Sequence, residues 1–113
     1  MRIPHITIHT NKQAECVEFY KKYAGLEVVR EIPGIIFMGN GTEGETLVEL
    51  IQDENSYEGS GISIGFACKD VHVQHDIIAA AGLEVTPMIT PNPFVKFFFT
   101  KDPSGVSVQF IAG

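Results

Sequence analysis

Glu49 is the residue of this chain whose surroundings most clearly indicate chemistry. It stands among apolar neighbours in the segment 47–51, and a carboxylate in such a strand is costly to bury unless it is paired or coordinates a ligand. Near the start of the chain, His5 and His9 lie on either side of Thr7. Two imidazoles and a carboxylate are a common ligand set for a divalent metal. These residue types therefore predict either a metal site or a hydrogen-bonded polar cluster around Glu49.

Strand periodicity indicates which side chains share a face with Glu49, because residues two apart in a strand point the same way. In the first predicted strand, residues 4–10, Ile6 and Ile8 alternate with the polar residues. In the predicted strand 46–52, Val48 and Leu50 face the helix and leave Glu49 on the other side. The same reasoning in the second half of the chain completes a cleft that holds His5, Thr7, His9, Glu49, Ser63, Ser107 and Gln109.

The predicted elements that carry these residues occur twice in the sequence. The letters Ala-Gly-Leu-Glu-Val occur at 24–28 and again at 81–85, and each half ends in an apolar strand with one polar residue. Self-similarity at a fixed spacing indicates a duplicated supersecondary unit. Each half reads as β-α-β-β-β, so we predict an α+β fold of two paired βαβββ modules that form a curved mixed β-sheet cleft. The expected single domain covers residues 1–113, with module one at 1–55 and module two at 60–113.

Local signals define the predicted helices. Thr10 and Gln13 have the spacing of a capping box for a helix that ends near Tyr23, with Gly25 in the following left-handed position. Asp70 is the predicted N-cap of a second helix that ends near residue 80, before Gly82. The polar segment 53–61 is the expected joint between the halves. The remaining predicted strands cover residues 26–32, 35–38, 62–68, 84–89, 95–100 and 106–111.

Composition narrows the functional classes. The chain has 113 residues and a net charge of −6, which argues against a nucleic-acid partner because such binding depends on Lys and Arg neutralising phosphates. The acidity would suit a cationic ligand, although it more often serves only solubility. No apolar run is long enough for a membrane span, and we expect a cytoplasmic protein. Cys16 and Cys68 have no metal-type spacing, and we expect both to be buried thiols.

Two further groups are expected to be structural. We predict that His72 and His75 are solvated residues of the second helix. The aromatic run Phe94, Phe97, Phe98 and Phe99 should mostly belong to the core. Those phenylalanines that face the cleft would wall a ligand pocket.

Taken together, the segments 5–8, 18–20, 25–28 and 102–105 resemble the glyoxalase/bleomycin resistance/dioxygenase superfamily, also called vicinal oxygen chelate proteins. The resemblance covers essentially the whole chain and implies paired βαβββ modules, often in a homodimer. It also implies metal-ligand positions at His5, Glu49, Ser63 and Gln109. His5 and Glu49 match the usual ligands. Ser63 departs from the pattern because a hydroxyl is a poor ligand, and Gln109 departs in part.

These departures limit the chemistry that the resemblance implies. Glyoxalase I activity needs a carboxylate that moves protons, and Gln109 cannot be a general base, so Glu49 is the candidate catalytic residue. Ring-cleaving chemistry needs two histidines and a carboxylate, a set that fails here unless His9 substitutes. Fosfomycin-type transfer needs the full His-His-Glu set and fails similarly. The bleomycin-binding branch uses no metal and traps a cationic drug.

Three hypotheses follow. The first is a small-molecule-binding protein with a degenerate metal site, in which Thr7, His9, Ser63 and Ser107 contact the ligand. The second is a metal-dependent lyase or isomerase, similar to lactoylglutathione lyase, that acts on a small oxygenated substrate and holds its metal with His5, Glu49 and Gln109. The cofactor is either a divalent ion (Zn, Ni, Mn or Fe) or absent. The third is a partner-binding regulatory domain with a degenerate cleft.

Overall fold

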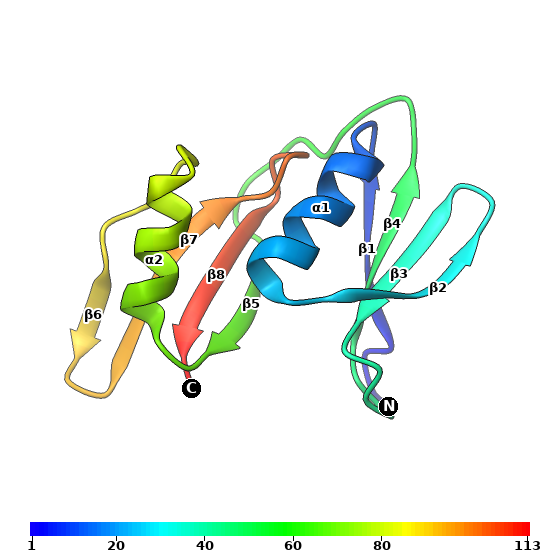
Figure 1. Ribbon diagram of the computed structural model, residues 1–113. Helices are drawn as coiled ribbons and strands as arrows, with labels where there is room; N and C mark the ends of the chain where they lie inside the picture. Colours follow the sequence, from blue (N-terminus) through cyan, green and yellow to red (C-terminus); the bar gives the residue numbers. More distant parts are fainter. The chain divides into compact units, whose positions relative to one another are not determined.

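The computed structural model describes all 113 residues, which divide into two compact units, Met1–Glu58 and Gly59–Gly113. Each unit holds one helix and one four-stranded mixed sheet (Figure 1). The sheet orders are β1-β4-β3-β2 in the first unit and β5-β8-β7-β6 in the second. These orders correspond element by element along the chain. The predicted α+β fold with a duplicated βαβββ unit is therefore confirmed.

The first unit contains β1 and β4 as a parallel pair, with β3 and β2 added in antiparallel fashion. One residue, Gly25, ends the helix with a φ of 67°, and its backbone N–H donates to Tyr20 O, as expected for a left-handed terminal glycine. The elements are β1 (His5–Thr10), α1 (Gln13–Ala24), β2 (Glu27–Ile32), β3 (Ile35–Gly39) and β4 (Leu47–Gln52).

The second unit repeats this plan, with β5 and β8 parallel and β7 antiparallel to β8. Asp70 caps the helix as predicted, because its carboxylate accepts a hydrogen bond from Val73 N at 3.1 Å. The elements are β5 (Ser63–Cys68), α2 (Val71–Ala80), β6 (Ile89–Asn92), β7 (Val95–Lys101) and β8 (Ser107–Ala112).

In each unit the helix covers one face of the sheet, and the apolar half of the strand alternation lies beneath it (Figure 1). We call the opposite face of each sheet the helix-distal face. The buried apolar residues of the first unit are Ile8, Cys16, Val17, Phe19, Tyr20, Leu26, Met38, Val48 and Leu50. Those of the second unit are Ile64, Val71, Ile78, Phe98, Val106, Val108 and Phe110. The faces predicted for β1, β4, β5 and β8 are therefore those that the structure shows.

The segment Asp102-Pro103-Ser104-Gly105 forms the turn between β7 and β8. Asp102 is buried, and its Oδ1 accepts hydrogen bonds from Ser104 N at 2.9 Å, Ser104 Oγ at 2.7 Å and Val106 N at 3.0 Å. This network adds to the backbone hydrogen bonds of the turn, from Asp102 N to Val106 O and from Gly105 N to Asp102 O. The motif therefore serves the fold rather than a site.

Two local predictions were wrong. The N-cap of α1 is Lys12, with no side-chain cap. Gln13 instead donates from Nε2 to Leu50 O at 2.9 Å and Gly34 O at 3.1 Å, which ties the helix to the sheet. The strand predicted at 84–89 is replaced by a single bridge between Val85 and Thr100 followed by β6. A proline at position 87 cannot donate to a ladder, which explains the interruption.

The histidine and cysteine expectations need correction as well. His75 is only partly exposed: its Nε2 lies 2.9 Å from Thr86 O, and its ring packs edge-on against Phe98 at 4.9 Å. Cys16 is buried as predicted, whereas Cys68 is only partly buried, and the two form no disulfide. No helix of the chain is long and apolar enough to cross a membrane.

Candidate functional site

The strand registers of the first unit place a row of side chains across its helix-distal face. Glu49 on β4 lies opposite Thr7 on β1 and opposite Phe37 on β3. Arg30 on β2 lies opposite Phe37. Paired residues of neighbouring strands point to the same face, so four strands contribute a hydroxyl, a carboxylate, an aromatic ring and a guanidinium in that order. We call this set the Arg30–Thr7 row.

Glu49 is held by two side chains of β1. Thr7 Oγ1 donates a hydrogen bond to Glu49 Oε1, and His5 Nε2 lies 3.6 Å from the same oxygen. The side chain of Glu49 is only 11% exposed, whereas that of His5 is 43% exposed. A carboxylate so enclosed is tolerable because it has a donor within reach. The polar cluster expected around Glu49 therefore exists within the first unit.

Phe37 is the centre of a set of ring contacts. The His5 ring meets Phe37 edge-on with centroids 6.0 Å apart. On its other flank, Arg30 Cζ lies 5.5 Å from the Phe37 centroid, within the range of a cation–π contact. Phe37 thus forms an apolar platform between two nitrogen-bearing side chains.

A hollow of about 500 Å³ adjoins this platform. It is a depression that is widely open to solvent rather than an enclosed cavity. The loop on one side is fixed by Glu45, whose carboxylate accepts hydrogen bonds from Asn40 N at 2.6 Å and Thr42 N at 2.7 Å. The hollow is lined by Arg2, Pro4, His5, Val29, Arg30, Phe37, residues 41–45 and Leu47. His5 and Phe37 belong both to the hollow and to the surroundings of Glu49, so they join the two features.

His9 occupies the opposite end of β1. Its Nδ1 lies 3.2 Å from Asp53 Oδ2, and both side chains are largely exposed. In the strand register His9 lies opposite Ile51, not opposite Glu49. The structure therefore pairs His9 with the end of the first unit rather than with the Glu49 cluster.

The equivalent face of the second unit carries weaker donors. Ser63 Oγ donates to Ser107 Oγ at 2.8 Å. Gln109 lies opposite Gly65, so close that a Cβ on Gly65 would come within 3.1 Å of Gln109 Oε1. The predicted cleft that would unite these three polar residues with the Glu49 cluster stays a prediction.

Aromatic residues line this second face as well. Phe99 lies opposite Gln109 and meets Phe97 edge-on with centroids 5.6 Å apart, while Phe98 is fully buried on the helix side. The prediction that this aromatic run mostly belongs to the core is therefore wrong. Only Phe98 is buried, Phe97 and Phe99 are half-buried on the opposite face, and Phe94 is exposed.

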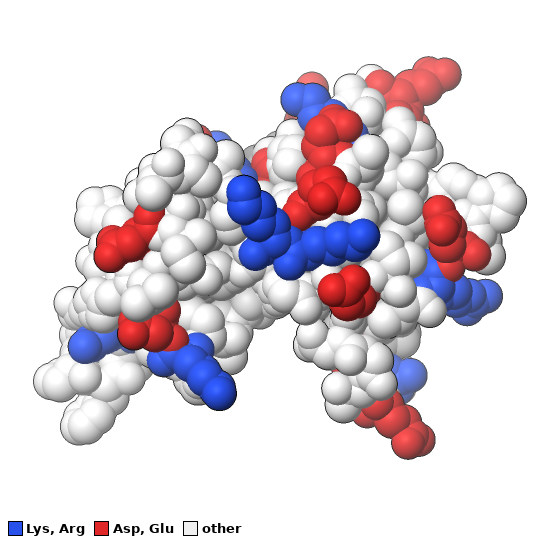
Figure 2. All heavy atoms as spheres, in the orientation of Figure 1, with Lys and Arg blue, Asp and Glu red and all other residues white.

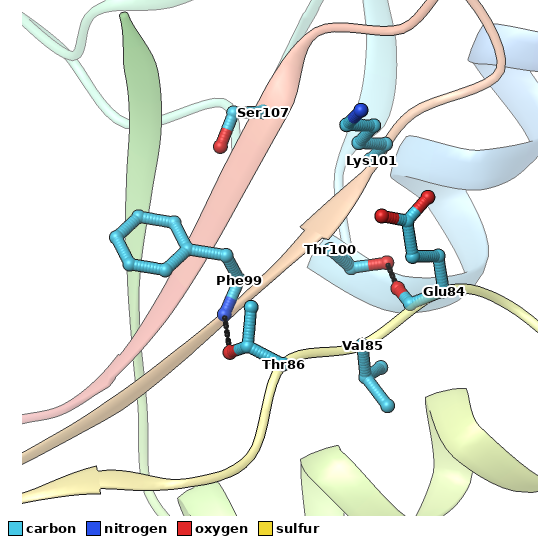
Figure 3. A pocket seen from close by; sticks show the side chains of 7 residues that line it. All are labelled: Glu84, Val85, Thr86, Phe99, Thr100, Lys101 and Ser107. Carbon is cyan, nitrogen blue, oxygen red and sulfur yellow. Dashed lines mark hydrogen bonds between the residues drawn. The ribbon is translucent and has the colours of Figure 1, made fainter. Parts of the chain in front are cut away.

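The second unit also has a small hollow of about 100 Å³ near Glu84, Val85, Thr86, Phe99, Thr100, Lys101 and Ser107 (Figure 3). Its two threonines are committed to the backbone: Thr100 Oγ1 donates to Glu84 O at 2.6 Å, and Thr86 Oγ1 accepts from Phe99 N at 3.0 Å. These bonds hold the irregular segment against β7, so the hollow is mainly a consequence of that anchoring.

The donor chemistry at the predicted ligand positions can be tested against a divalent metal. His5 and Glu49 are strong donors, and their 3.6 Å separation is close to that of two ligands sharing one zinc ion at bond lengths of about 2.0–2.2 Å. Ser63 uses its hydroxyl proton on Ser107, and Gln109 offers only a neutral amide oxygen. No group of three or more His, Cys, Asp or Glu residues is placed to hold a metal ion. These four residues therefore do not form the complete set of metal ligands that a metal-dependent lyase needs.

Four residues that line the hollow are not marked by any motif of the sequence: Arg2, Arg30, Phe37 and Glu45. Alternation along the strand 35–38 could have separated Phe37 from Ile36 and Met38. The pairing of β3 with β4 then places Phe37 on the same face as Glu49. Nothing in the sequence marked Arg30, because its position depends on the register between β2 and β3. Figure 2, which presents one face of the molecule, shows Lys and Arg side chains lying among acidic ones.

Comparisons with known proteins agree with the fold. The sequence model of the Glyoxalase/Bleomycin resistance protein/Dioxygenase superfamily matches residues 2–110. The Pseudomonas aeruginosa protein described as uncharacterized protein PA2024 is 24% identical over 98% of this chain and 88% of its own length. Among solved structures, lactoylglutathione lyase from Agrobacterium tumefaciens gives a TM-score of 0.74 at 19% identity, over 99% of this chain and 93% of that one. TnmS3, an antibiotic binding protein from Streptomyces sp. CB03234, gives 0.76 at 16% identity, over 97% and 93%.

Proposed function

Because the chain belongs to the Glyoxalase/Bleomycin resistance protein/Dioxygenase superfamily, we propose that it is a small-molecule-binding protein that uses the helix-distal face of its first unit. The observation that carries this proposal is that His5 and Phe37 connect the hollow with the surroundings of Glu49. These two side chains line the hollow of about 500 Å³ and also flank Glu49. An apolar platform beside a few convergent polar groups is typical of ligand sites.

The residue roles follow from their chemistry. Glu49, held by Thr7, would accept a hydrogen bond from a ligand hydroxyl or amine. Phe37 would supply contact area for a flat or apolar body. The structural similarity to an antibiotic binding protein supports a binding role on this fold. Gln109 and the Ser63–Ser107 pair would bring neutral hydrogen-bonding groups rather than a reactive centre.

A ligand screen tests the proposal. We would titrate a diverse small-molecule set into the purified protein and follow its melting temperature, since binding to the folded state raises it. Glu49→Gln should weaken a hit by about tenfold or more, because hydrogen bonds to charged groups contribute about 1.5–3 kcal/mol. Glu18→Gln removes the same charge from the exposed surface of α1 and should leave the affinity unchanged. A hit that both variants bind equally would contradict the site, and a screen without any hit would favour the partner-binding hypothesis.

The competing function is a metal-dependent, glyoxalase-like lyase. The observation in its favour is the 3.6 Å approach of His5 Nε2 to Glu49 Oε1, and the structural similarity to a lactoylglutathione lyase is compatible with it. Metal content of the purified protein, followed by thermal-shift titration with zinc, nickel, manganese and iron, separates the two. About one metal per chain, with a stabilisation lost in both His5→Ala and Glu49→Ala, would favour the lyase. No metal and no shift would retire it.

We also propose that the protein is a cytoplasmic homodimer without a nucleic-acid partner. The resemblance to this superfamily implies paired modules that often come from two chains. A net charge of −6 opposes binding to the phosphates of a nucleic acid. Light scattering at several concentrations tests the dimer. A mass of 12.4 kDa, that of one chain, at every concentration would contradict it.

A further inference from the structure

A β-bulge determines what the Arg30–Thr7 row contains. Val28 pairs with Met38, but the register then shifts, and Arg30 pairs with Phe37. One extra residue, Val29, is accommodated in β2. Without it, Arg30 would lie opposite Ile36, whose own partner Leu50 is fully buried on the helix side. The bulge therefore turns Arg30 onto the helix-distal face, and re-aiming a side chain is a recurrent use of bulges beside functional sites.

Arg30 has no acidic partner once it reaches this face. Its guanidinium lies 5.5 Å from the Phe37 centroid, and no ion pair of the chain includes it. A guanidinium beside a ring keeps its N–H groups free at its edge, in the planar arrangement that matches a carboxylate. All ion pairs of the chain involve histidines, so Arg30 shares its lack of a carboxylate partner with the other Lys and Arg residues.

The other charged residues around the hollow leave this cation available. Arg2 lines the same hollow. The carboxylate of Glu45 is occupied by two backbone N–H groups of its own loop, and Glu49 lies two strands away from Arg30, next to Thr7. Glu43 is the remaining acidic residue, and it is exposed on the loop. The lining of the hollow thus combines two arginines with two glutamates, and Arg30 is a cation there that no carboxylate pairs.

We propose that the ligand of this site is a small carboxylic acid with a flat apolar body and a hydrogen-bond donor at its far end. The carboxylate binds Arg30, the body lies on Phe37, and the donor reaches Glu49. Two strand spacings separate Arg30 from Glu49, about 10 Å, which fits a single substituted ring. This inference rests on the proposed binding function and specifies its ligand class, against the cationic ligand that the net charge alone would favour.

Three matched probes test the inference. They are 4-(hydroxymethyl)benzoate, its neutral amide 4-(hydroxymethyl)benzamide and its cationic analogue 4-(hydroxymethyl)benzylamine, which share one body and one hydroxyl. Each is titrated into ¹⁵N-labelled protein, and dissociation constants are taken from backbone shifts in β2, β3 and β4. Wild type should bind the acid at least about tenfold more tightly than the amide, as expected for a charge-assisted pair. The amine should bind most weakly.

Variants assign the preference to Arg30. Arg30→Gln should abolish the acid-over-amide ratio, and Arg30→Lys should retain part of it. Lys22→Gln is the matched control, because Lys22 is also an exposed cation over a ring, 5.4 Å from the centroid of Tyr23, on α1. It should leave the ratio unchanged. A ratio is insensitive to a general loss of affinity, and spectral dispersion checks that each variant is folded.

The possible outcomes distinguish a failure of this ligand class from a failure of the proposed binding function. If the amide or the amine binds as well as the acid, or if Arg30→Gln keeps the preference, the ligand class is wrong. If Glu49→Gln still weakens the binding of these probes, the proposed binding function remains supported even though the ligand class is wrong. If none of the three probes shifts the β2–β4 signals at millimolar concentration, the ligand class is likewise overturned, and the broader ligand screen decides the function independently.

Discussion

Thr7 donates a hydrogen bond to Glu49 across β1 and β4, whereas Gly65, at the equivalent place in the second unit, has no side chain to offer Gln109. Both pairs lie on the parallel first and last strands of their units. Where the first unit stabilises a carboxylate with a hydroxyl, the second carries a neutral amide over a glycine, 3.1 Å from where a Cβ would lie. The duplicated units have therefore diverged, and the charged chemistry is concentrated in the first.

Thr7→Val should destabilise the protein. Valine has nearly the same shape but no hydroxyl, so Glu49 would keep its enclosed position without its donor. We expect a loss of about 1–3 kcal/mol in the free energy of unfolding, measured by urea titration at pH 7. Thr7→Ser keeps the hydroxyl and should lose less; equal losses in the two variants would show that the hydrogen bond contributes nothing.

Leu50→Ala and Ile51→Ala should differ because adjacent residues of β4 point to opposite faces. Leu50 is fully buried under α1, while Ile51 is partly exposed on the helix-distal face. Leu50→Ala should cost about 2–5 kcal/mol, and Ile51→Ala clearly less. Urea denaturation of both variants checks the assignment of the faces, and a larger loss for Ile51→Ala would reverse it.

Asp102→Ala should weaken the turn between β7 and β8. The change removes the acceptor of three hydrogen bonds from a buried site, and we expect a loss of about 2–4 kcal/mol. Asp102→Asn retains an acceptor oxygen and should lose less. The control Asp76→Ala alters a side chain that is 86% exposed and should change stability by no more than about 0.5 kcal/mol. Thermal and urea unfolding should rank the three variants in that order.

Cys68 should make the protein less stable at alkaline pH. Burial, and secondly the charge of Asp70, raise the pKa of the Cys68 thiol. The folded state then holds the thiol proton more tightly than the unfolded state, so the contribution is complete below the ordinary thiol pKa and is lost as pH rises through the raised pKa. The rate of iodoacetamide alkylation at Cys68, followed by peptide mass spectrometry, should have a higher pH midpoint in folded than in urea-unfolded protein.

Asp70→Asn separates the two causes of that shift. Asparagine preserves the cap of α2 but removes the negative charge, so the alkylation midpoint of Cys68 should fall toward that of the unfolded chain without reaching it. An unchanged midpoint would assign the whole shift to burial. A folded-state midpoint at or below the unfolded one in the parent protein would contradict the raised pKa itself.

Much of the Glu49 cluster could be predicted because it depends on alternation within single strands. Once Ile6 and Ile8 are assigned to the core, Thr7 and His5 must face away from it, and the same holds for Glu49 between Val48 and Leu50. Predictions from short capping motifs had mixed outcomes, because the caps at Gly25 and Asp70 are present whereas the capping box at Thr10 is not. Gln13 has capping-box spacing, yet its side-chain amide donates to backbone carbonyls of Gly34 and Leu50 instead of accepting from the backbone of Thr10.

By itself the sequence determined the duplicated units, because the segment 24–28 recurs at 81–85. It also determined the faces of the strands and the position of one carboxylate among apolar residues, because these follow from the period of two residues in a strand. Only the tertiary structure decided that Arg30 belongs beside Phe37. That placement depends on a one-residue bulge in β2 relative to β3. Without the bulge Arg30 would face the core side. The register between two strands is set by the packing of the whole sheet, so it cannot be predicted from the spacing of residues along the chain.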